Sequence, residues 1–214
     1  MPSDLIVWGV GTSRTIRVHW MLAELGLDYE TRAIGSRTGE TLTPEFLRLN
    51  PRHKVPVLQH GPRIITESAA IIQYLGETFD APEGMFVPRT SGERAQLNEW
   101  CYFIGTELDA SSLYVVRKHL GLKHIYGEAP VAVESARKYF SENAESMAPR
   151  ISAAPYLMGD RFSPADILLT TCLEWAAVEK ISLSDALNVY RRRMTERPAF
   201  RVALQKNAVR SNPA

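Results

Sequence analysis

Residues His53–Ile71 read HKVPVLQHGPRIITESAAI, and this stretch decides the fold. Two short apolar runs, VPVLQ and RIIT, flank HGP, which is the pattern of two strands joined by a turn. A proline within a strand removes a backbone donor, so the first strand belongs at an edge or a bend. The second run ends at TES, and a helical pattern follows over AAIIQYL. The stretch therefore predicts strand, turn, strand and helix in that order.

The chain before this stretch alternates strand and helix. LIVW at residues 5–8 predicts a strand, and apolar spacing over 18–25 predicts a helix that Gly26 ends. DYETRAI at 28–34 is extended in character, and TPEFLRLNP at 43–51 predicts a short helix that a proline ends. A strand–helix–strand unit implies parallel strands, so this half predicts an α/β domain.

The second half of the chain lacks a convincing strand pattern. FDAPEGMFVPRTSGE at 79–93 carries two prolines and two glycines, as a domain linker does. We expect an α/β domain over 1–80, a linker over 81–90 and an all-helical domain over 91–214. The helices are expected over 93–121, 129–151, 163–179, 184–196 and 198–205. Within the third helix, Ser163, Pro164 and Asp166 form a variant capping box, to which we assign a structural role.

Composition excludes several classes of protein. The chain has 214 residues, 45% hydrophobic and 23% charged, with a net charge of +1. That balance does not favour a nucleic-acid or membrane partner, and neither a spanning segment nor a signal peptide is evident. Cys101 and Cys172 stand far apart, which fits neither a disulfide framework nor a metal site. We therefore expect a cytoplasmic protein without a metal.

Glu67 and Ser68 stand where the second strand meets the helix. Ser68 is suited to capping the helix, whose first amides attract carboxylates, and Glu67 is suited to an ammonium group. If Val55–Pro56 is cis, the backbone of Val55 turns outward and an extended peptide can pair with it. Together these features describe a site for a small peptide with a free α-amino-acid end. The alternative is a proline-terminated strand beside an ordinary N-cap.

NPRHKVPVL at 50–58 and ITESAAIIQYL at 65–75 resemble the glutathione-binding half of the glutathione transferases, which carries a Val–cis-Pro and an acid–serine pair. EWCYFIGTEL at 99–108, GDRFSPADILL at 159–169 and RRMTERPAFRVAL at 192–204 resemble the helical half, most closely in the bacterial beta class. The resemblance covers nearly the whole chain. It implies the glutathione transferase fold, a thioredoxin-like N-terminal domain followed by an all-helical C-terminal domain.

The resemblance also implies roles in glutathione binding. Glu67 and Ser68 would hold the γ-glutamyl end, and Val55 would pair with the cysteinyl backbone. For His53 the alternative is an exposed loop histidine. The implied glutathione-binding residues are His53, Lys54, Val55, Pro56, Glu67 and Ser68.

GVGTSRT at residues 9–15 joins the first strand to the first helix, and it offers what a thiolate needs. Thr12 and Ser13 carry hydroxyls, Arg14 carries a positive charge, and helix N-terminal amides favour an anion. The alternative is that one hydroxyl only caps the helix. By the resemblance Ser13 stands where the beta class has its cysteine, and Thr12 where serine or threonine acts in zeta-like and nu-like members. Ser13 is the first candidate and Thr12 the second.

The electrophile would lie against the helical domain. Tyr102 and Trp175 match positions that approach the site in beta-like members. The position of a beta-class histidine falls at Asp109, which does not donate a proton at neutral pH. Together with the missing cysteine, this leaves direct activation of the glutathione thiol rather than thiol transfer. The candidate electrophile residues are Tyr102, Phe103, Leu108, Asp109, Tyr114 and Trp175; for each the alternative is a core position.

The sequence predicts a homodimeric glutathione transferase that attaches glutathione to an apolar electrophile, as in detoxification. Two alternatives remain open. One is another glutathione-dependent enzyme on the same fold, such as a peroxidase, isomerase, dehalogenase or ether-cleaving enzyme. The other is a non-catalytic binding protein of this fold.

Overall fold

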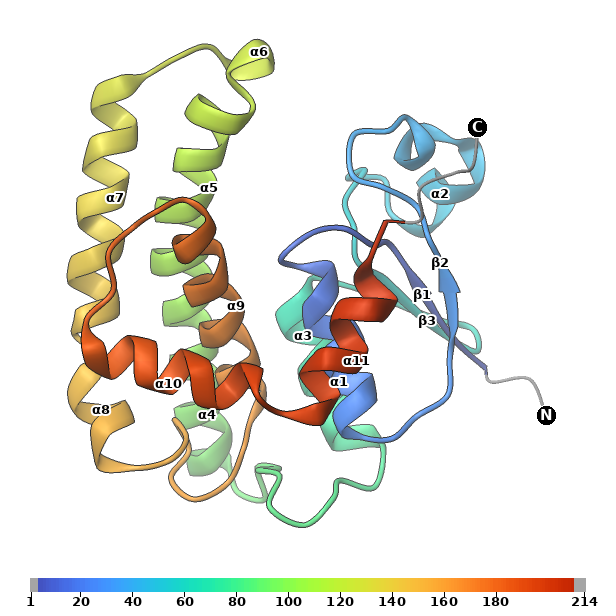
Figure 1. Ribbon diagram of the computed structural model, residues 1–214. Helices are drawn as coiled ribbons and strands as arrows, with labels where there is room; N and C mark the ends of the chain where they lie inside the picture. The colour runs from blue at the N-terminus through green and yellow to red at the C-terminus, as the bar shows by residue number, and fades with distance from the viewer. Residues whose placement is uncertain (1–3, 210–214) are drawn as a thin grey trace. The chain divides into compact units, whose positions relative to one another are not determined.

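The computed structural model describes residues 4–209, and its contacts divide the chain into two compact units (Figure 1). One unit takes in the chain up to Glu83 and again from Glu196, and the other runs Gly84–Thr195. The domain limits 1–80, 81–90 and 91–214 stay predictions, and their ends at 1–3 and 210–214 lie outside the described residues. By its packing, the last helix belongs with the first unit.

The first unit is built on a four-stranded mixed sheet in the order β2-β1-β3-β4. Its strands are β1 (Leu5–Trp8), β2 (Glu30–Arg32), β3 (Val57–His60) and β4 (Arg63–Thr66). β1 and β2 are parallel, as the strand–helix–strand pattern predicts, whereas β3 is antiparallel to both β1 and β4. The predicted thioredoxin-like sheet is confirmed, and the paired runs VLQH and RIIT form its hairpin.

Helix α1 (Thr15–Glu24) connects β1 to β2 and is buried almost throughout. It packs against α3 (Ser68–Thr78) and α11 (Pro198–Asn207) within the same unit (Figure 1). Gly26, at φ 64°, follows its C-terminus. The amides of Gly26 and Leu27 donate to the carbonyls of Ala23 and Leu22, so the helix end predicted at Gly26 is confirmed as a Schellman motif.

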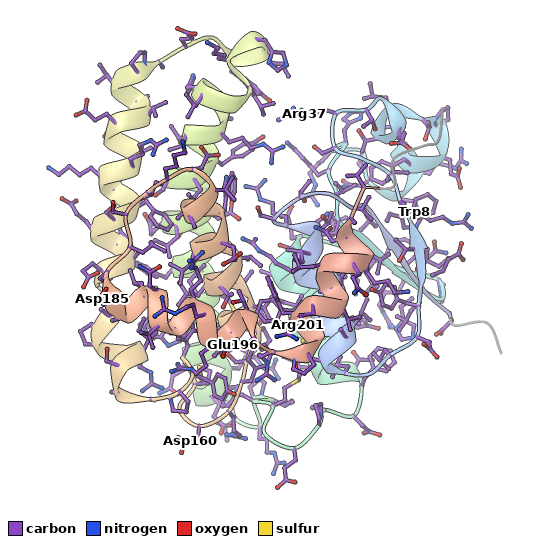
Figure 2. The ribbon with its side chains drawn as sticks, viewed as in Figure 1. Trp8, Arg37, Asp160, Asp185, Glu196 and Arg201 are labelled. Atoms are coloured by element: carbon purple, nitrogen blue, oxygen red, sulfur yellow. The ribbon has the colours of Figure 1, made fainter. Side chains whose placement is uncertain are left out.

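A second hydrophobic cluster lies where α2 (Pro44–Leu49) meets the sheet. Phe46 is fully buried and meets the Trp8 ring edge-on, with 6.3 Å between the ring centroids. Val57 completes the buried part of this cluster. Figure 2 labels Trp8 among the side chains of the first unit. This packing fixes the chain that leads from α2 through Pro51 to β3. A short 3-10 turn, η1 (Glu40–Leu42), precedes α2.

The second unit is helical throughout, apart from its loops and two isolated β-bridges. The expected long helix is interrupted in its backbone pattern, because two π-helical segments widen it. The expected helix over 129–151 is instead two helices, since Pro149 begins a new one and cannot continue the first. The elements are α4 (Ser91–Phe103), η2 (Ile104–Leu113), α5 (Tyr114–Val116), η3 (Arg117–Gly121), α6 (Lys123–Tyr126), α7 (Pro130–Glu145), α8 (Ala148–Ala153), α9 (Pro164–Val178) and α10 (Asp185–Thr195). Among the helices of residues 4–209, none combines the length and the hydrophobicity needed to cross a membrane.

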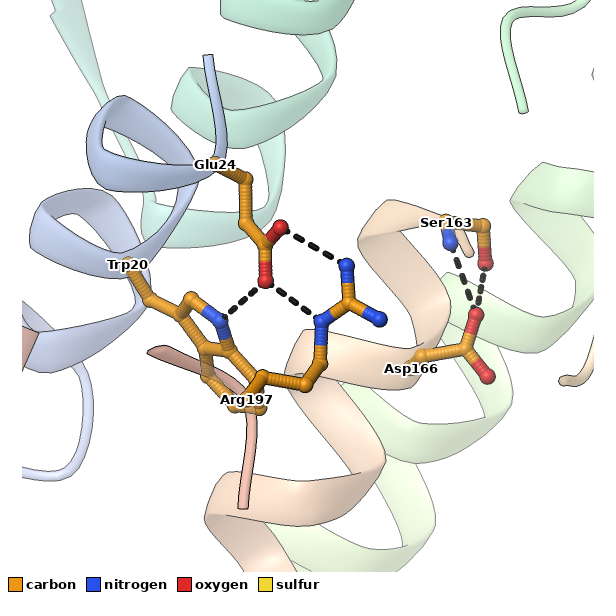
Figure 3. Close-up of polar contacts among 5 residues, drawn as sticks. All are labelled: Trp20, Glu24, Ser163, Asp166 and Arg197. Atoms are coloured by element: carbon orange, nitrogen blue, oxygen red, sulfur yellow. Dashed lines mark hydrogen bonds and ion pairs between the residues drawn. The ribbon is translucent and has the colours of Figure 1, made fainter. Parts of the chain in front are cut away.

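The capping box predicted at the start of α9 is confirmed and holds a fully buried carboxylate. One oxygen of Asp166 accepts from the amide and the hydroxyl of Ser163, at 2.8 and 2.6 Å (Figure 3). The other accepts from the Leu157 amide at 2.8 Å and the Tyr190 hydroxyl at 2.6 Å. Burial raises the pKa of Asp166, while these four donors oppose that shift. The carboxylate therefore ties α9 to α10 and to the loop before it.

We expect Asp166→Ala to lower the free energy of unfolding by about 3–5 kcal/mol, because four buried donors lose their acceptor. Asp166→Asn should be nearly as damaging, since its amide nitrogen cannot accept from either pair of donors. Asp160→Asn is the matched control at an exposed position of the preceding loop. Urea unfolding followed by circular dichroism measures all three, and an Asp166→Ala variant as stable as the control would contradict this role.

Candidate functional site

The loop between β1 and α1 is held by backbone hydrogen bonds to the neighbouring chain. The amides of Gly9 and Val10 donate to the carbonyls of Arg32 and Ile34, at 2.9 and 3.0 Å. Gly9 has φ 114°, which side chains rarely allow. A Cβ at Gly9 would lie 2.5 Å from the Cβ of Val55, so this loop and the chain before β3 are in direct contact. Two parts of the predicted site are thereby adjacent.

Thr12 and Thr15 cap the start of α1 reciprocally. The Thr12 hydroxyl oxygen accepts from the Thr15 amide at 3.0 Å and from the Arg14 amide at 3.3 Å. In return, the Thr12 amide donates to the Thr15 hydroxyl oxygen at 2.9 Å. The pair has the reciprocal bonding of a capping box, but it lies in the turn that leads into α1, whose N-cap position is Arg14. The capping alternative considered from the sequence therefore describes Thr12.

Ser13 differs from Thr12 because its hydroxyl is not used in such hydrogen bonds. Neither its hydroxyl nor its amide makes a hydrogen bond to the described part of the chain. The side chain is partly exposed in the turn just before α1, and Arg14 beside it is partly exposed as well. A free hydroxyl and a free helix-terminal amide on one residue form a small donor site for an anion. Of the two candidates, Ser13 is the one with an available donor.

The chain before β3 presents an unpaired backbone. The Val55–Pro56 bond is cis, as predicted. The carbonyl of Lys54, one residue earlier, accepts from Asn50 Nδ2 at 2.9 Å. Val55 itself makes no hydrogen bond to residues 4–209, so its N–H and C=O are available to an extended peptide.

Glu67 occupies a strained backbone position at the start of α3. Its φ of 68° and ψ of 115° are unusual for a residue with a side chain, and such conformations cost about 1–3 kcal/mol. Its carboxylate is exposed and lies 3.6 Å from a guanidinium nitrogen of Arg52. Although Glu67 is the N-cap residue of α3, its carboxylate makes no hydrogen bond to the first amides of the helix. The negative charge is instead exposed to solvent.

Ser68 does not cap α3, contrary to our expectation. It is the first helical residue, and Glu67 takes the N-cap position without a side-chain hydrogen bond. The buried Ser68 hydroxyl instead accepts from the guanidinium of Arg17 at 3.2 Å. Arg17, which is only 3% exposed, was missed from the sequence. No local sequence signal pointed to it, because its partner Ser68 lies 51 positions further along the chain.

The remaining predicted glutathione-binding residues are His53 and Lys54, which are exposed in the loop before Val55. His53 has φ 56°, and its Nδ1 lies 3.3 Å from the carbonyl oxygen of Thr41. Arg52, which was also missed, adds a third basic side chain to this loop and donates to the Thr66 hydroxyl at 2.5 Å. The sequence signal was the basic run Arg-His-Lys at 52–54.

The buried side chain of His19 hydrogen-bonds to the loop between β1 and α1. His19 Nε2 lies 3.2 Å from the Gly9 carbonyl, so it carries the proton, and Nδ1 accepts from the Tyr29 hydroxyl at 2.9 Å. Burial lowers the pKa of His19 to about 4, the Gly9 hydrogen bond opposes this, and the charge of Lys206 lowers it further. Burial also raises the pKa of Tyr29 to about 12. Both rings are therefore neutral at pH 7.

The candidate electrophile residues belong to the second unit and differ in exposure. Tyr102 is 64% exposed, whereas Leu108 has no exposed surface and Asp109 is 2% exposed. Trp175 is 7% exposed, and its indole donates to Glu179 at 3.2 Å. Phe103 and Tyr114 are partly exposed. These residues stay predictions, and full burial of Leu108 favours its core alternative.

The arrangement in the first unit combines separate binding elements with one donor for an anion. Glu67 offers an acceptor to an ammonium group, Val55 offers backbone pairing, and the loop at 52–54 offers positive charge. Ser13 offers the hydroxyl and the amide. Within the described residues, no group of three or more His, Cys, Asp and Glu side chains is placed to hold a metal ion.

Three comparisons with known proteins agree with this architecture. Residues 3–77 match the family model of the glutathione S-transferase N-terminal domain. Glutathione S-transferase D7 of Drosophila melanogaster is 30% identical over 168 residues, which are 78% of this chain and 72% of that protein. A crystal structure of a glutathione transferase from Methylococcus capsulatus is 30% identical, with a TM-score of 0.79 over 95% of this chain and 98% of the other.

The glutathione transferase URE2P6 from Phanerochaete chrysosporium, solved in complex with oxidized glutathione, is also similar. It is 25% identical to this chain, and its TM-score is 0.82 over 96% of each chain.

The shifted pKa of His19 predicts a loss of stability in mild acid. The unfolded chain binds a proton near the ordinary pKa of 6.5, whereas the folded chain resists protonation until about pH 4. Stability is therefore highest above pH 6.5 and falls as the pH drops toward 4, by roughly 3 kcal/mol in all. Urea unfolding between pH 4 and pH 7.5 measures the slope.

His19→Gln removes the titrating group, so its curve should be flatter over this range. His53→Gln, at an exposed histidine, is the control and should keep the slope of the unaltered protein. Equal slopes for His19→Gln and His53→Gln would show that His19 does not titrate as inferred.

Proposed function

The chain belongs to the glutathione S-transferase family, and on that premise we propose that it binds glutathione and bonds the glutathione sulfur to an apolar electrophile. The observation that carries this proposal is Ser13, whose unpaired hydroxyl and amide stand at the N-terminus of α1 in a loop that contacts Val55. A peptide paired with Val55 would bring its neighbouring side chain toward that loop.

Each end of glutathione has a chemically matched group in this proposal. The γ-glutamyl ammonium would meet the exposed carboxylate of Glu67, and the α-carboxylate would meet the first amides of α3 at Ser68. The cysteinyl backbone would pair with Val55 in the manner of an added strand. The glycine carboxylate would face Lys54 and His53. Pro56 ends the pairing segment, because it lacks a backbone N–H.

Arg17 and Arg52 extend this scheme beyond the residues expected from the sequence. Arg17 holds the Ser68 hydroxyl from within the unit at 3.2 Å and places a buried positive charge beneath the N-terminus of α3. Such a charge favours a carboxylate at that terminus. A guanidinium nitrogen of Arg52 lies 3.6 Å from the exposed carboxylate of Glu67 and places a positive charge beside it.

The chemical step needs a thiolate, because a thiol at its ordinary pKa is mostly protonated at pH 7. We propose that the Ser13 hydroxyl donates a hydrogen bond to the glutathione sulfur, with the Ser13 amide and the charge of Arg14 assisting. The sulfur then attacks the electrophile, forming a carbon–sulfur bond while a leaving group departs or a proton is taken up. With serine in this position, no mixed disulfide with glutathione forms at residue 13.

Other parts of the expected function stay predictions. These predictions are the likeness to the beta class, the cytoplasmic location, a role in detoxification and the homodimer. The electrophile wall of Tyr102, Phe103, Leu108, Asp109, Tyr114 and Trp175 is another. The free hydroxyl of Ser13 favours an enzyme over a non-catalytic binding protein, since a binding protein has no use for an anion donor at the sulfur.

We expect Glu67→Ala to weaken glutathione binding about ten- to a hundred-fold, the effect of removing a charge-assisted hydrogen bond worth about 1.5–3 kcal/mol. Isothermal titration calorimetry measures the affinity. Glu67→Gly should lose binding equally and yet fold more stably than Glu67→Ala, because glycine tolerates φ 68°. Glu45→Ala, at an exposed position of α2, is the control. Unchanged affinity in both Glu67 variants would refute the proposed ammonium site.

We expect Ser13→Ala to raise the pKa of bound glutathione by about one unit, since one hydroxyl supplies roughly 1–1.5 kcal/mol. Conjugation near pH 6.5 should slow by about ten-fold, with little change in affinity. The ultraviolet absorbance of the thiolate, titrated in the complex, reports the pKa.

Thr12→Val is the matched variant, and it should act differently. It removes a helix cap, so the unfolding free energy should fall by about 1 kcal/mol, while the thiol pKa should move less than in Ser13→Ala. A larger pKa shift in Thr12→Val would reassign the activating hydroxyl to Thr12.

A further inference from the structure

Helix α11 is joined to α1 at both of its ends, although the two helices are far apart in sequence. At its N-terminal end, Arg197 donates to both carboxylate oxygens of Glu24, at 2.6 and 2.8 Å (Figure 3). Glu24 also accepts from the Trp20 indole at 2.8 Å. Trp20 in turn meets the Phe200 ring edge-on, with 4.7 Å between the centroids. This end is a part-buried ionic and aromatic contact between the two helices.

The C-terminal end of α11 is different, because Asn207 bonds to the loop that carries Ser13. The Gly11 amide donates to the Asn207 backbone carbonyl at 2.8 Å and to Oδ1 at 3.1 Å. The Thr15 hydroxyl donates to the same Oδ1 at 2.6 Å. Asn207 Nδ2 donates to the Thr12 carbonyl at 3.3 Å. One side chain therefore contacts the loop at three residues on both sides of Ser13.

The orientation of the Asn207 amide follows from its partners. An amide N–H of Gly11 can only donate, so the atom that faces it is the oxygen. The nitrogen then faces the Thr12 carbonyl, which can only accept. Since both ends of the amide have a complementary partner, the side chain is held in one orientation rather than two.

The chain that follows α11 also closes over this loop. A Cβ at Gly11 would lie 2.5 Å from Cγ2 of Val209. Gly11 has φ 78°, so both its backbone conformation and its surroundings require glycine. The end of α11 thus sits directly on the turn that precedes Thr12.

We propose that Asn207 is a positioning residue for thiol activation, and that the end of α11 is a working part of this centre. The proposal rests on the proposed function. Ser13 makes no hydrogen bond of its own to the described chain, so the direction of its hydroxyl and amide is set by its neighbours. Those neighbours are the Thr12–Thr15 capping pair, and Asn207 bonds to both members.

This arrangement matters because a donor aids an anion only when it is aimed before the anion forms. Asn207→Ala would keep the Thr12–Thr15 pair and the bond from the Gly11 amide to the backbone carbonyl of residue 207. It would remove the three side-chain bonds that tie Gly11, Thr12 and Thr15 to α11. The first turn of α1 would then sample several orientations, and a misplaced donor loses most of its effect on the reacting atom. Glutathione would still bind through Glu67, Ser68 and Val55, which Asn207 does not touch.

The test compares Asn207→Ala with Arg197→Lys, which weakens the other end of the same helix. For Asn207→Ala we expect the pKa of bound glutathione to rise by about one unit, as for the loss of one aimed donor. The kcat near pH 6.5 should fall about five- to ten-fold, while KM for glutathione changes less than about two-fold. Hydrogen exchange at the Gly11 amide should accelerate modestly, because this amide loses the side-chain acceptor and keeps the backbone one, and this readout needs no ligand.

Arg197→Lys keeps the charge but loses the two-pronged contact with Glu24. It should lower the unfolding free energy and leave the bound thiol pKa unchanged. Thr15→Val removes the contact with Asn207 together with the acceptor of the Thr12 amide, and it should raise the thiol pKa in the same direction. Because both variants remove the Thr15–Asn207 hydrogen bond, adding Asn207→Ala to Thr15→Val should shift the pKa by less than the sum of the single changes.

The outcomes separate this inference from the function on which it rests. If the unaltered protein does not bind glutathione in the calorimeter, the proposed function fails and the inference falls with it. If it binds glutathione and Asn207→Ala has the thiol pKa of the unaltered protein, only the inference is overturned. An equal pKa shift in Arg197→Lys would also overturn it, since general loosening of α11 would then suffice. Should Asn207→Ala not fold, Thr15→Val decides by the same pKa readout.

Discussion

The burial of α1 is the constraint on which the rest of the first unit depends. The helix is enclosed by α3 and α11, and its residues from Thr15 to Leu22 are all buried. The first amides of a helix have no partner within the helix, so the protein, water or a ligand must satisfy its N-terminus. Thr12 and Thr15 satisfy part of that terminus reciprocally, and Asn207 satisfies the turn before it. The donors of Ser13 are what remains.

The polar side chains inside α1 follow the same logic. Arg17 and His19 would each be costly to bury without a partner. Arg17 donates to Ser68 at the start of α3, and His19 holds the Gly9 carbonyl of the loop. Arg17 therefore contacts the part of the candidate site at α3, and His19 contacts the part in the loop before α1. The burial that stabilises the unit is also what gives these contacts their rigidity, because no water competes for them.

Much of the fold could be predicted from the sequence because its signals were local. RIIT, Gly26 and the Ser-Pro-Ala-Asp capping box each specify a turn, an end or a start within a few residues. Pro149 was overlooked as a break, although the same local rule applies to it. The candidate site was harder, since its supports join residues far apart in the chain. Asn207 contacts Thr15 across 192 positions, and Arg17 meets Ser68 across 51, so no spacing pattern could reveal either.

The choice between Thr12 and Ser13 shows why the hydrogen bonds are needed as well as the sequence. The two residues are adjacent, carry the same group and stand equally close to the helix terminus, so propensity cannot separate them. What separates them is the use already made of each hydroxyl. The Thr12 oxygen accepts two amides and lies 3.0 Å from the Thr15 hydroxyl, which occupies its bonding capacity. A hydroxyl that serves the helix in this way would have to break those bonds to serve a thiolate, whereas Ser13 would break none.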